Sequence, residues 1–525
     1  MTARPRLSRR RFRCVHAALL ALLLALAATW APAAPPSQLP WLADGARQAR
    51  IAVRLLGAAA AHGLDPERYG AADLARRLDG PHPPAHAAAL ERDLSGAVAH
   101  YLADLHQGRA PSAYRGAGDA SGFDPAALLA RAFMEQRLEQ AVDAAAPAIP
   151  LYPRVMASLA HYRELARLHP QWPALPAPAG SAAGDSYPGA DLLRERLLVL
   201  GDLGADSADG ESAPGVYSAG LAHAVRRFQA RHGLAEDGVL GPRTLAALSV
   251  PLPQRVAQLA LTLERLRWLP PLPQGRMVAV NLPAYRLWAF DRSLPDPGPP
   301  LEMRIIVGTA ARTPTPLFIG QMRYLELNPY WNVPRSIAVG EILPKLAHNP
   351  AYLVQNDMEV VAADGRVLAA GGAAQAAVRA GSARIRQRPG PRNVLGALKF
   401  AMPNPMNIYL HSTSSRDLFE RSRRDLSHGC IRVEAPVALA RFLLADPQRW
   451  DEDGIETAIK SGRTRTLPLP APVPVVLFYA TAVSDRGGRV LFADDIYRQD
   501  APLIEMLGLA MAPRHPAPES PAGAR

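Results

Sequence analysis

The stretch NIYLHSTSSRDLFERSRRDLSHGCIRV, residues 407–433, is the most informative part of this chain. It opens with an apolar run typical of a β-strand that ends at His411, and nineteen residues later it reaches Cys430. A thiol attacks carbonyl groups as its thiolate, so it needs a base or a positive charge nearby. His411 is a candidate base, because the end of a strand can present a side chain to a cleft. His428, two residues before the thiol, is a second candidate.

The neighbours of Cys430 favour a nucleophile over a buried apolar cysteine. Gly429 lets the backbone approach closely, so the amide N–H groups beside Cys430 can point at a developing oxyanion. Arg432 adds a fixed positive charge, which favours a thiolate and can meet a carboxylate. A nucleophile, a base and oxyanion donors together predict a cysteine acyl-transfer site.

The N-terminus reads as an export signal, residues 1–33. The basic run RPRLSRRRFR precedes the apolar core AALLALLLALAA, and APA ending at Ala33 offers small residues for cleavage. The core is short for a membrane span, so we expect cleavage and a periplasmic protein with no permanent span; an uncleaved anchor is the alternative. SRRRF also resembles a twin-arginine signal, which leaves the export route open.

Charge and cysteine content narrow the class of protein. Six arginines lie before residue 14, and without them the formal charge of the 525 residues falls from +12 to +6, so nucleic acid is not implied as a partner. The two cysteines are Cys14, in the signal, and Cys430, which therefore has no internal partner in a compartment where disulfides usually form. The histidines form no H-E-x-x-H pattern, so no metal site is expected.

The first part of the mature chain is predicted to be helical. LERDLSGAVAHYLADLHQGR places five apolar residues at helical spacing, namely Leu90, Leu94, Val98, Tyr101 and Leu105. We expect a helical scaffold domain over residues 41–185, completed by residues 252–275.

Residues 186–251 are predicted to form a three-helix module. LAHAVRRFQARHGL is an amphipathic helix that stops at Gly233, and EDGVLGPRTLAAL supplies a turn followed by a helix with Pro242 just inside its start. The pattern resembles the small peptidoglycan-binding module of cell-wall enzymes. An ordinary helical bundle is the alternative.

From residue 276 to residue 500 the pattern is mainly β. MVAVNLPAYRLWAFD and LEMRIIVG alternate apolar and polar residues, and a hairpin is predicted to turn at residues 485–488. A helix-like insertion interrupts these strands at about residues 334–380. The last segment, residues 512–525, is predicted to be a disordered tail.

The pattern H…SHGC-I-R resembles the signature of the L,D-transpeptidases, whose catalytic domain is of the YkuD type. NPYWNVP, IRQRPGPRNVLGALKF and IYLH also resemble segments of that family. The order of signal, helical domain, binding module and catalytic domain is similar to the large periplasmic members that contain a scaffold. The resemblance implies a multidomain α+β fold: a helical scaffold, a three-helix module and a mainly β catalytic domain with a helical capping insertion.

The resemblance also implies roles for individual residues. Cys430 would be the nucleophile and His411 the base. The residues that would orient the base or shape the oxyanion hole are Ser412, Ser427, His428 and Gly429. The residues that would contact substrate are Arg432, Tyr409, Asn393, Arg392 and Trp331. No metal or other cofactor is implied.

The implied reaction forms a thioester on Cys430 from a tetrapeptide stem of peptidoglycan and passes it to an amine of another stem, giving a 3→3 crosslink. The implied partners are stem peptides and glycan, with other cell-wall synthases as further candidates. Two alternatives stay open. Water could be the acceptor, which would make the enzyme an L,D-carboxypeptidase or endopeptidase, or the chain could be a non-catalytic wall-binding scaffold.

Overall fold

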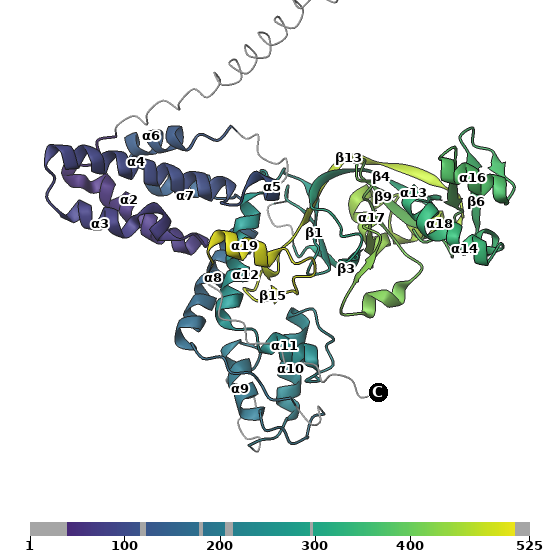
Figure 1. Ribbon diagram of the computed structural model, residues 1–525, viewed down its shortest axis with the longest axis horizontal. Coiled ribbons are helices and arrows are strands. Elements are labelled where there is room, and N and C mark those ends of the chain that lie inside the picture. The colour runs from purple at the N-terminus through teal and green to yellow at the C-terminus, as the bar shows by residue number, and fades with distance from the viewer. Residues whose placement is uncertain (1–38, 116–121, 178–181, 205–213, 295–297, 510–525) are drawn as a thin grey trace, which may run out of the picture. The chain divides into compact units, whose positions relative to one another are not determined.

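The computed structural model describes residues 39–115, 122–177, 182–204, 214–294 and 298–509 (Figure 1). The signal expected at residues 1–33 and the tail expected at 512–525 lie outside them. The described chain divides into two compact units. The first comprises the described parts of residues 1–60, 65–106 and 123–146, and the second comprises the rest.

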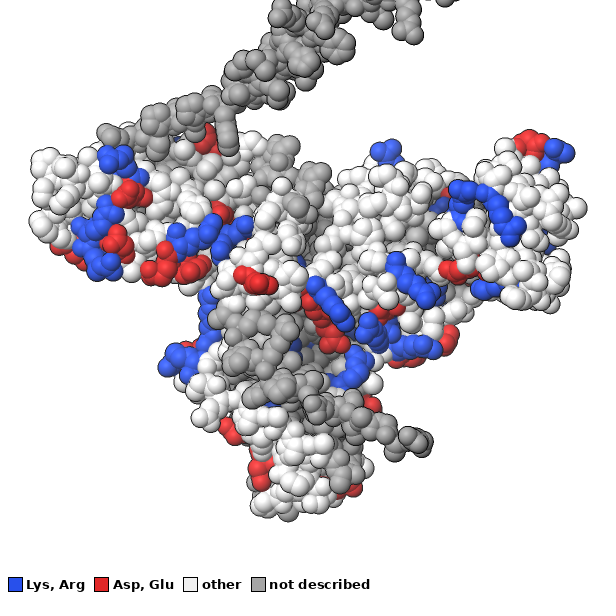
Figure 2. All heavy atoms as spheres, in the orientation of Figure 1, with Lys and Arg blue, Asp and Glu red and all other residues white. Residues whose placement is uncertain are grey.

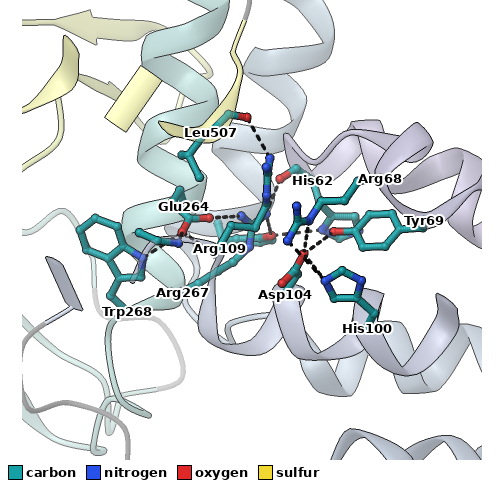
Figure 3. A network of polar contacts seen from close by, with 12 residues as sticks. His62, Arg68, Tyr69, His100, Asp104, Arg109, Glu264, Arg267, Trp268 and Leu507 are labelled. Atoms are coloured by element: carbon teal, nitrogen blue, oxygen red, sulfur yellow. Dashed lines mark hydrogen bonds and ion pairs between the residues drawn. The ribbon is translucent and has the colours of Figure 1, made fainter. Parts of the chain in front are cut away.

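The first unit is entirely helical in its regular structure. Its elements are η2 (Asp44–Ala46), α2 (Arg47–Gly57), most of η3 (Ala58–His62), η4 (Pro66–Tyr69), α3 (Ala71–Asp79), α4 (Pro84–Gln107), α6 (Pro125–Met134) and α7 (Leu138–Ala145). The five apolar residues predicted to share a face of α4 are all buried. Trp41 anchors the core, because its indole N–H donates to Ser95 Oγ at 2.8 Å and Phe133 packs edge-on 4.8 Å from its ring. Buried Asp104 accepts hydrogen bonds from Tyr69 and Arg68 (Figure 3).

The surface of this unit mixes charges of both signs. Figure 2 shows basic side chains lying among acidic ones over its visible face. Arg77, for example, pairs with Asp93 at 2.7 Å and Arg50 with Asp79 at 3.3 Å. Exposed pairs of this kind add little stability, but they leave no broad single-sign surface on this face.

In the second unit, a buried helix supports the parts around it. α12 (Leu252–Arg267) packs against α8 (Leu151–Leu168) and α19 (Asp500–Leu507), and α5 (Ser112–Arg115) belongs to the same unit. Glu264 Oε1 accepts hydrogen bonds from the backbone N–H groups of Arg109 and Ala110, and Glu264 Oε2 pairs with Arg267 at 3.1 Å (Figure 3). Arg267 also donates to Tyr152 OH at 2.9 Å. This charged network ties the 107–110 segment and α8 to α12.

The three-helix module comprises α9 (Ala190–Val199), α10 (Ala219–Arg231) and α11 (Pro242–Leu248). Gln229 explains much of its sequence pattern. Its amide N–H₂ donates to Asp237 Oδ1 at 2.8 Å and to Val239 O, and its Oε1 accepts from Gly238 N at 2.8 Å. Gly238 has φ +71°, which glycine adopts without strain. One glutamine therefore fixes the Asp-Gly turn that leads into α11.

A nine-stranded sheet forms the core of the β domain, in the order β11-β3-β12-β10-β9-β4-β13-β1-β2. β2 also pairs with β3, so the sheet closes on itself. Its strands are β1 (Arg276–Asn281), β2 (Arg286–Asp291), β3 (Leu301–Gly308), β4 (Phe318–Leu327), β9 (Leu398–Ala401), β10 (Leu410–His411), β11 (Asp425–Ser427), β12 (Ile431–Val433) and β13 (Arg465–Phe478). Helices α17 (Pro436–Leu444) and α18 (Glu452–Lys460) add apolar side chains to the same core. The predicted hairpin at 485–488 is confirmed by the antiparallel pair β14 (Ala482–Ser484) and β15 (Val490–Phe492).

The insertion contains strands as well as the helices that its sequence predicts. The helices are α13 (Arg335–Ile337), the π-helix η6 (Ala338–Ile342), α14 (Leu343–His348), α15 (Tyr352–Gln355) and α16 (Gly372–Ala380). β5 (Trp331–Asn332), β6 (Met358–Ala362), β7 (Val367–Leu368) and β8 (Ala383–Gln387) form a second sheet in the order β5-β8-β6-β7. β6, α14 and α16 lie together in Figure 1, with an apolar core of their own. These strands are short, so their periodicity gave little signal.

The Glu264–Arg267 pair provides a test of how this unit is held together. Glu264→Gln keeps the shape of the side chain but leaves the buried Arg267 without its counter-charge, which should cost about 3 kcal/mol in the free energy of unfolding. Chemical denaturation followed by tryptophan fluorescence measures the loss. Glu456→Gln, which breaks an exposed pair with Lys460, is the matched control and should leave the transition unchanged. Equal transitions for the two variants would contradict the role given to Glu264.

Candidate active site

Two adjacent parallel strands bring the predicted site residues together. β10 pairs with β12 so that Leu410 faces Ile431 and His411 faces Arg432. The ladder extends one residue further back, because Ile431 N donates to Tyr409 O at 3.1 Å. Residues nineteen to twenty-one positions apart in the chain are thereby neighbours in space.

The alternation of side chains puts the polar residues of both strands on one face. Leu410 and Ile431 are fully buried in the apolar core of the sheet. Successive side chains of a strand point to opposite faces, so His411 and Arg432 share the face away from that core. Tyr409 and Cys430 come directly before the two strands, and the same alternation puts them on that face. The thiol and the predicted base are therefore diagonal neighbours across a strand pair.

His411 is held as a neutral, oriented imidazole. It is 5% exposed, and burial, followed by the charge of Arg432, lowers its pKa to about 3. Its Nδ1 lies 2.6 Å from Ser412 O. A carbonyl oxygen only accepts, so Nδ1 carries the proton and Nε2 is left as the acceptor. That tautomer suits a general base.

Ser412 is itself fixed on three sides. Its Oγ donates to Leu395 O at 2.9 Å and accepts from Leu398 N at 3.0 Å, and its backbone N–H donates to Leu398 O at 2.8 Å. Gly396 makes room for it, because a Cβ at that position would lie 2.2 Å from Ser412 Oγ. The carbonyl that orients His411 therefore belongs to a residue with little freedom to move.

The thiol of Cys430 is half-buried and electrically neutral at rest. Burial raises its pKa, while hydrogen bonding with Tyr409 and the charges of Lys399 and Arg432 act in the opposite direction. Its Sγ lies 3.6 Å from Asn407 O. With the pKa of the thiol raised and that of His411 lowered, the resting pair is a thiol and a neutral imidazole. The thiolate would form only when the proton moves to His411.

Arg432 has no counter-charge in the described chain. Its Nε is buried and forms no hydrogen bond with any described residue, and burial lowers its pKa. The residue as a whole is half-buried, so its guanidinium is partly open to an incoming ligand that supplies the missing acceptor. Arg432 is thus the residue of this face most suited to bind a carboxylate.

The loop before Cys430 has its polar groups arranged around the nucleophile. Ser427 Oγ donates to Cys430 O and accepts from Gly429 N at 3.1 Å, so the amide of Gly429 is already engaged. Thr315 Oγ1 donates to Gly429 O at 2.8 Å. Gly429 has φ +110°, a conformation that favours glycine. The N–H of Cys430 donates to no acceptor in the described chain, which makes it the available oxyanion donor of this loop.

The side chain of His428 contacts the insertion. Its Nε2 lies 2.8 Å from Glu341 Oε1, on the π-helix η6 of the insertion. Of the two histidines considered as bases, the geometry therefore favours His411. Glu341 could not be predicted as this partner from the sequence, because 87 residues separate it from His428.

Lys399 and Glu326 continue the row of polar residues formed by His411 and Arg432 across the sheet. Neither residue was predicted from the sequence as part of the site. Lys399 faces His411 across β9 and β10, and Glu326 faces Lys399 across β4 and β9. The two form an ion pair at 3.2 Å, and the Lys399 ammonium lies 5.1 Å from the ring centre of Tyr409. The one available signal was a lysine at an alternate position of the apolar strand LKFA.

Trp331, Arg392 and Asn393 have different surroundings. Trp331 lies at the start of the insertion, and a hydrogen bond from it acts on the hydroxyl of Tyr409, whose pKa is raised mainly by burial. Asn393 is buried and donates to Pro329 O and Arg388 O, both at 3.0 Å. Arg392 pairs with Asp357 at 2.8 Å. The contacts of Asn393 and Arg392 therefore hold the base of the insertion, and a contact of either side chain with substrate stays a prediction.

Three family models match the chain. Residues 275–473 match YkuD, the L,D-transpeptidase catalytic domain, residues 36–159 match a scaffold domain, and residues 187–248 match a "Putative peptidoglycan binding domain". Most of the β domain, including the Cys430 site, thus lies within the region that matches the L,D-transpeptidase catalytic domain, and the two helical regions before it match a scaffold domain and a peptidoglycan-binding domain.

Individual proteins were also matched. A Haemophilus influenzae protein named "Putative L,D-transpeptidase" is 33% identical over 273 residues, which are 51% of this chain and 54% of that protein. The chain thus spans about half the length of this curated relative. The L,D-transpeptidase of Xylanimonas cellulosilytica is 20% identical over 58% of this chain and 99% of its own, with a TM-score of 0.18. That of Stackebrandtia nassauensis is 15% identical over 58% and 96%, with a TM-score of 0.23.

Two searches of the described residues were negative. None of their helices has both the length and the apolar character needed to cross a bilayer. They also contain no group of three or more histidine, cysteine, aspartate or glutamate side chains placed to hold a metal ion.

The protonation states of Cys430 and His411 can be tested by thiol alkylation. Because the pKa of the thiol is raised and that of the imidazole is low, the rate of modification by iodoacetamide should rise with pH, with a midpoint above that of an ordinary thiol. The rate is followed by intact mass against pH, with Cys430→Ala as the blank. A rate that is high and constant from about pH 5 to about pH 8 would reveal a thiolate–imidazolium pair and contradict this description.

Proposed function

We propose that this chain is a peptidoglycan L,D-transpeptidase that forms 3→3 crosslinks through a thioester on Cys430. The observation that carries the proposal is the register of β10 and β12, which sets Cys430, His411 and the unpaired Arg432 on one face. The match of this domain to the L,D-transpeptidase catalytic domain supports the same reaction class.

In the first half of the proposed reaction, Sγ of Cys430 attacks the carbonyl carbon of the third residue of a tetrapeptide stem, while Nε2 of His411 takes the thiol proton. The N–H of Cys430 donates to the oxygen that becomes negative. When the tetrahedral intermediate collapses, the bond to D-Ala breaks and His411 returns its proton to the leaving amine. A thioester remains on Cys430.

In the second half, the amine of another stem attacks the thioester, and His411 again takes and returns a proton. Arg432 would hold a carboxylate of the donor stem, because its planar guanidinium can meet both oxygens and has no other acceptor. The reaction as written needs no cofactor. Water as the acceptor would give a shortened stem in place of a crosslink.

The proposed substrates place the enzyme at the wall. We propose export to the periplasm with cleavage near Ala33, and binding of the wall through residues 186–251, which contain the region matched to the peptidoglycan-binding model. Stem peptides and glycan are the proposed partners, with other cell-wall synthases as further candidates. N-terminal sequencing of protein recovered from the periplasm tests the cleavage site.

The central test uses disaccharide-tetrapeptide as substrate and mass spectrometry of the products. The wild-type protein should form a crosslinked dimer with loss of D-Ala. Cys430→Ala should form none, and His411→Ala should be slower by about a hundredfold or more because the general base is lost. His348→Ala, in α14, is a control that should keep the wild-type rate. Tripeptide without dimer would make hydrolysis the main activity, and wild-type rates for Cys430→Ala would leave only a wall-binding role.

Arg432 can be tested separately by substitution. Arg432→Gln removes the charge that would meet the donor carboxylate, so kcat/KM for the tetrapeptide should fall by at least about tenfold. Arg463→Gln removes an exposed arginine outside the site and should have no effect. An unchanged kcat/KM for Arg432→Gln would remove Arg432 from the donor site.

Carbapenems, which acylate the cysteine of enzymes of this family, provide an independent readout. Incubation should add the mass of the drug to Cys430 and to no other residue, and His411→Ala should slow the addition. Peptide mapping by mass spectrometry locates the adduct. A thiol that is unmodified after long exposure would count against the proposed acylation chemistry.

A further inference from the structure

A pocket lies between the three-helix module and the β domain, and none of the residues of the candidate active site lines it. Its volume is about 60 Å³. Its walls come from the end of α10 and the start of α11 in the module, and from the loop before β2, β3, the segment before β11 and the loop after β15 in the β domain. Four arginines and two carboxylates line it, so its lining is positively charged.

Arg424 is the buried cation of this junction pocket. It is 6% exposed, and it donates through Nε to Ile305 O at 3.2 Å and through Nη1 to Arg421 O at 2.7 Å. No carboxylate in the described chain pairs with it. Burial, followed by the charges of Arg286 and Arg304, lowers its pKa to about 10. The guanidinium of Arg424 is therefore stabilised by two backbone carbonyls and by the ring of Tyr285, none of which carries a negative charge.

Of the other three arginines, one forms a buried ion pair and two form ion pairs that are partly exposed to solvent. Arg231 forms a buried pair with Asp202. Arg243, from α11, lies 3.2 Å from Asp494 and also donates through Nη1 to Ser422 Oγ, and Arg286 lies 3.5 Å from Glu302. The side chains of both ion pairs are partly exposed to solvent. Exposed pairs at these distances contribute little, so either arginine can exchange its partner for a ligand at low cost.

The volume limits what can enter. A water molecule needs about 10–15 Å³ in the same measure, so the junction pocket holds a carboxylate-sized group with a few waters and no sugar ring. A carboxylate also accepts the charge-assisted hydrogen bonds that the N–H groups of an arginine donate. The occupant is therefore a small anionic group at the end of a larger ligand that continues into solvent.

We propose that the junction pocket binds a carboxylate of a peptidoglycan stem peptide, held between Arg243 of the module and Arg424 of the β domain. This inference rests on the proposed function, because it takes the wall as the ligand of the module. The two arginines come from different domains, so a bound stem would join the module to the segment that leads through β11 to Cys430. The wall would then be held at the β domain as well as by the module.

Substituting each member of the Arg243–Asp494 ion pair in turn distinguishes a ligand-binding site from a purely structural contact between the two domains. Sedimentation with purified peptidoglycan sacculi gives the affinity of the full-length chain, carrying Cys430→Ala in every sample to prevent turnover. Arg243→Gln should weaken binding by about tenfold. Asp494→Asn removes the carboxylate that competes for Arg243 and should leave binding equal or tighter. If the ion pair were only a structural contact between domains, both variants would bind sacculi more weakly, and to the same extent. That result would overturn the proposal.

The source of the carboxylate is tested by competition. Excess soluble disaccharide-tetrapeptide should release the protein from sacculi, and it should do so less well for Arg243→Gln. Inorganic phosphate at the same concentration should release none. Release by phosphate and not by the muropeptide would assign the junction pocket to a free anion and overturn the proposal. Arg463→Gln is the charge-matched control for sedimentation and should bind like its parent.

The remaining outcomes distinguish this inference from the proposed function. If the wild-type protein forms crosslinked dimers while Arg243→Gln binds sacculi like its parent, the junction pocket inference alone fails. If the parent does not sediment with sacculi at all, wall binding by the module fails and this inference fails with it.

Discussion

The parallel pairing of β10 and β12 is the constraint on which the candidate site depends. Two apolar residues, Leu410 and Ile431, are fully buried in the core of the sheet, and a slip of one position would turn both of them outward. The burial of these side chains therefore sets which face receives His411 and Cys430. In this way hydrophobic packing on one side of the sheet determines polar geometry on the other, without any direct bond between the thiol and the base.

The same register arranges charge across the sheet. Glu326, Lys399, His411 and Arg432 lie opposite one another on four adjacent strands, so the imidazole is flanked by two cations. This flanking, together with burial, explains why its pKa is low and why a neutral base fits the resting site. The carboxylate of Glu326 compensates Lys399, whereas no described residue compensates Arg432. This row of polar residues therefore ends in a cation whose counter-charge does not come from the described chain.

The sequence predicted the elements that have strong local patterns and missed the contacts that depend on the tertiary fold. The apolar stripe of α4, the strand ending at His411 and the hairpin at 485–488 were all evident from periodicity and turn residues. The strands of the insertion were too short to stand out. The engagement of His428 with Glu341 and the position of Lys399 opposite His411 depend on strand order, which one sequence does not reveal. The hydrogen bonds from the Asn393 side chain to two backbone carbonyls also depend on the tertiary fold, and its expected contact with substrate stays a prediction.

The close approach of Gly396 to Ser412 has a consequence for how this protein can vary. Position 396 performs no chemistry, yet even a methyl group there would displace the serine whose carbonyl aligns the imidazole. The geometric demand of the proposed reaction thus reaches a residue that takes no part in the reaction scheme. Among natural or engineered variants, many exposed positions around the thiol should therefore accept substitution more readily than Gly396 accepts alanine.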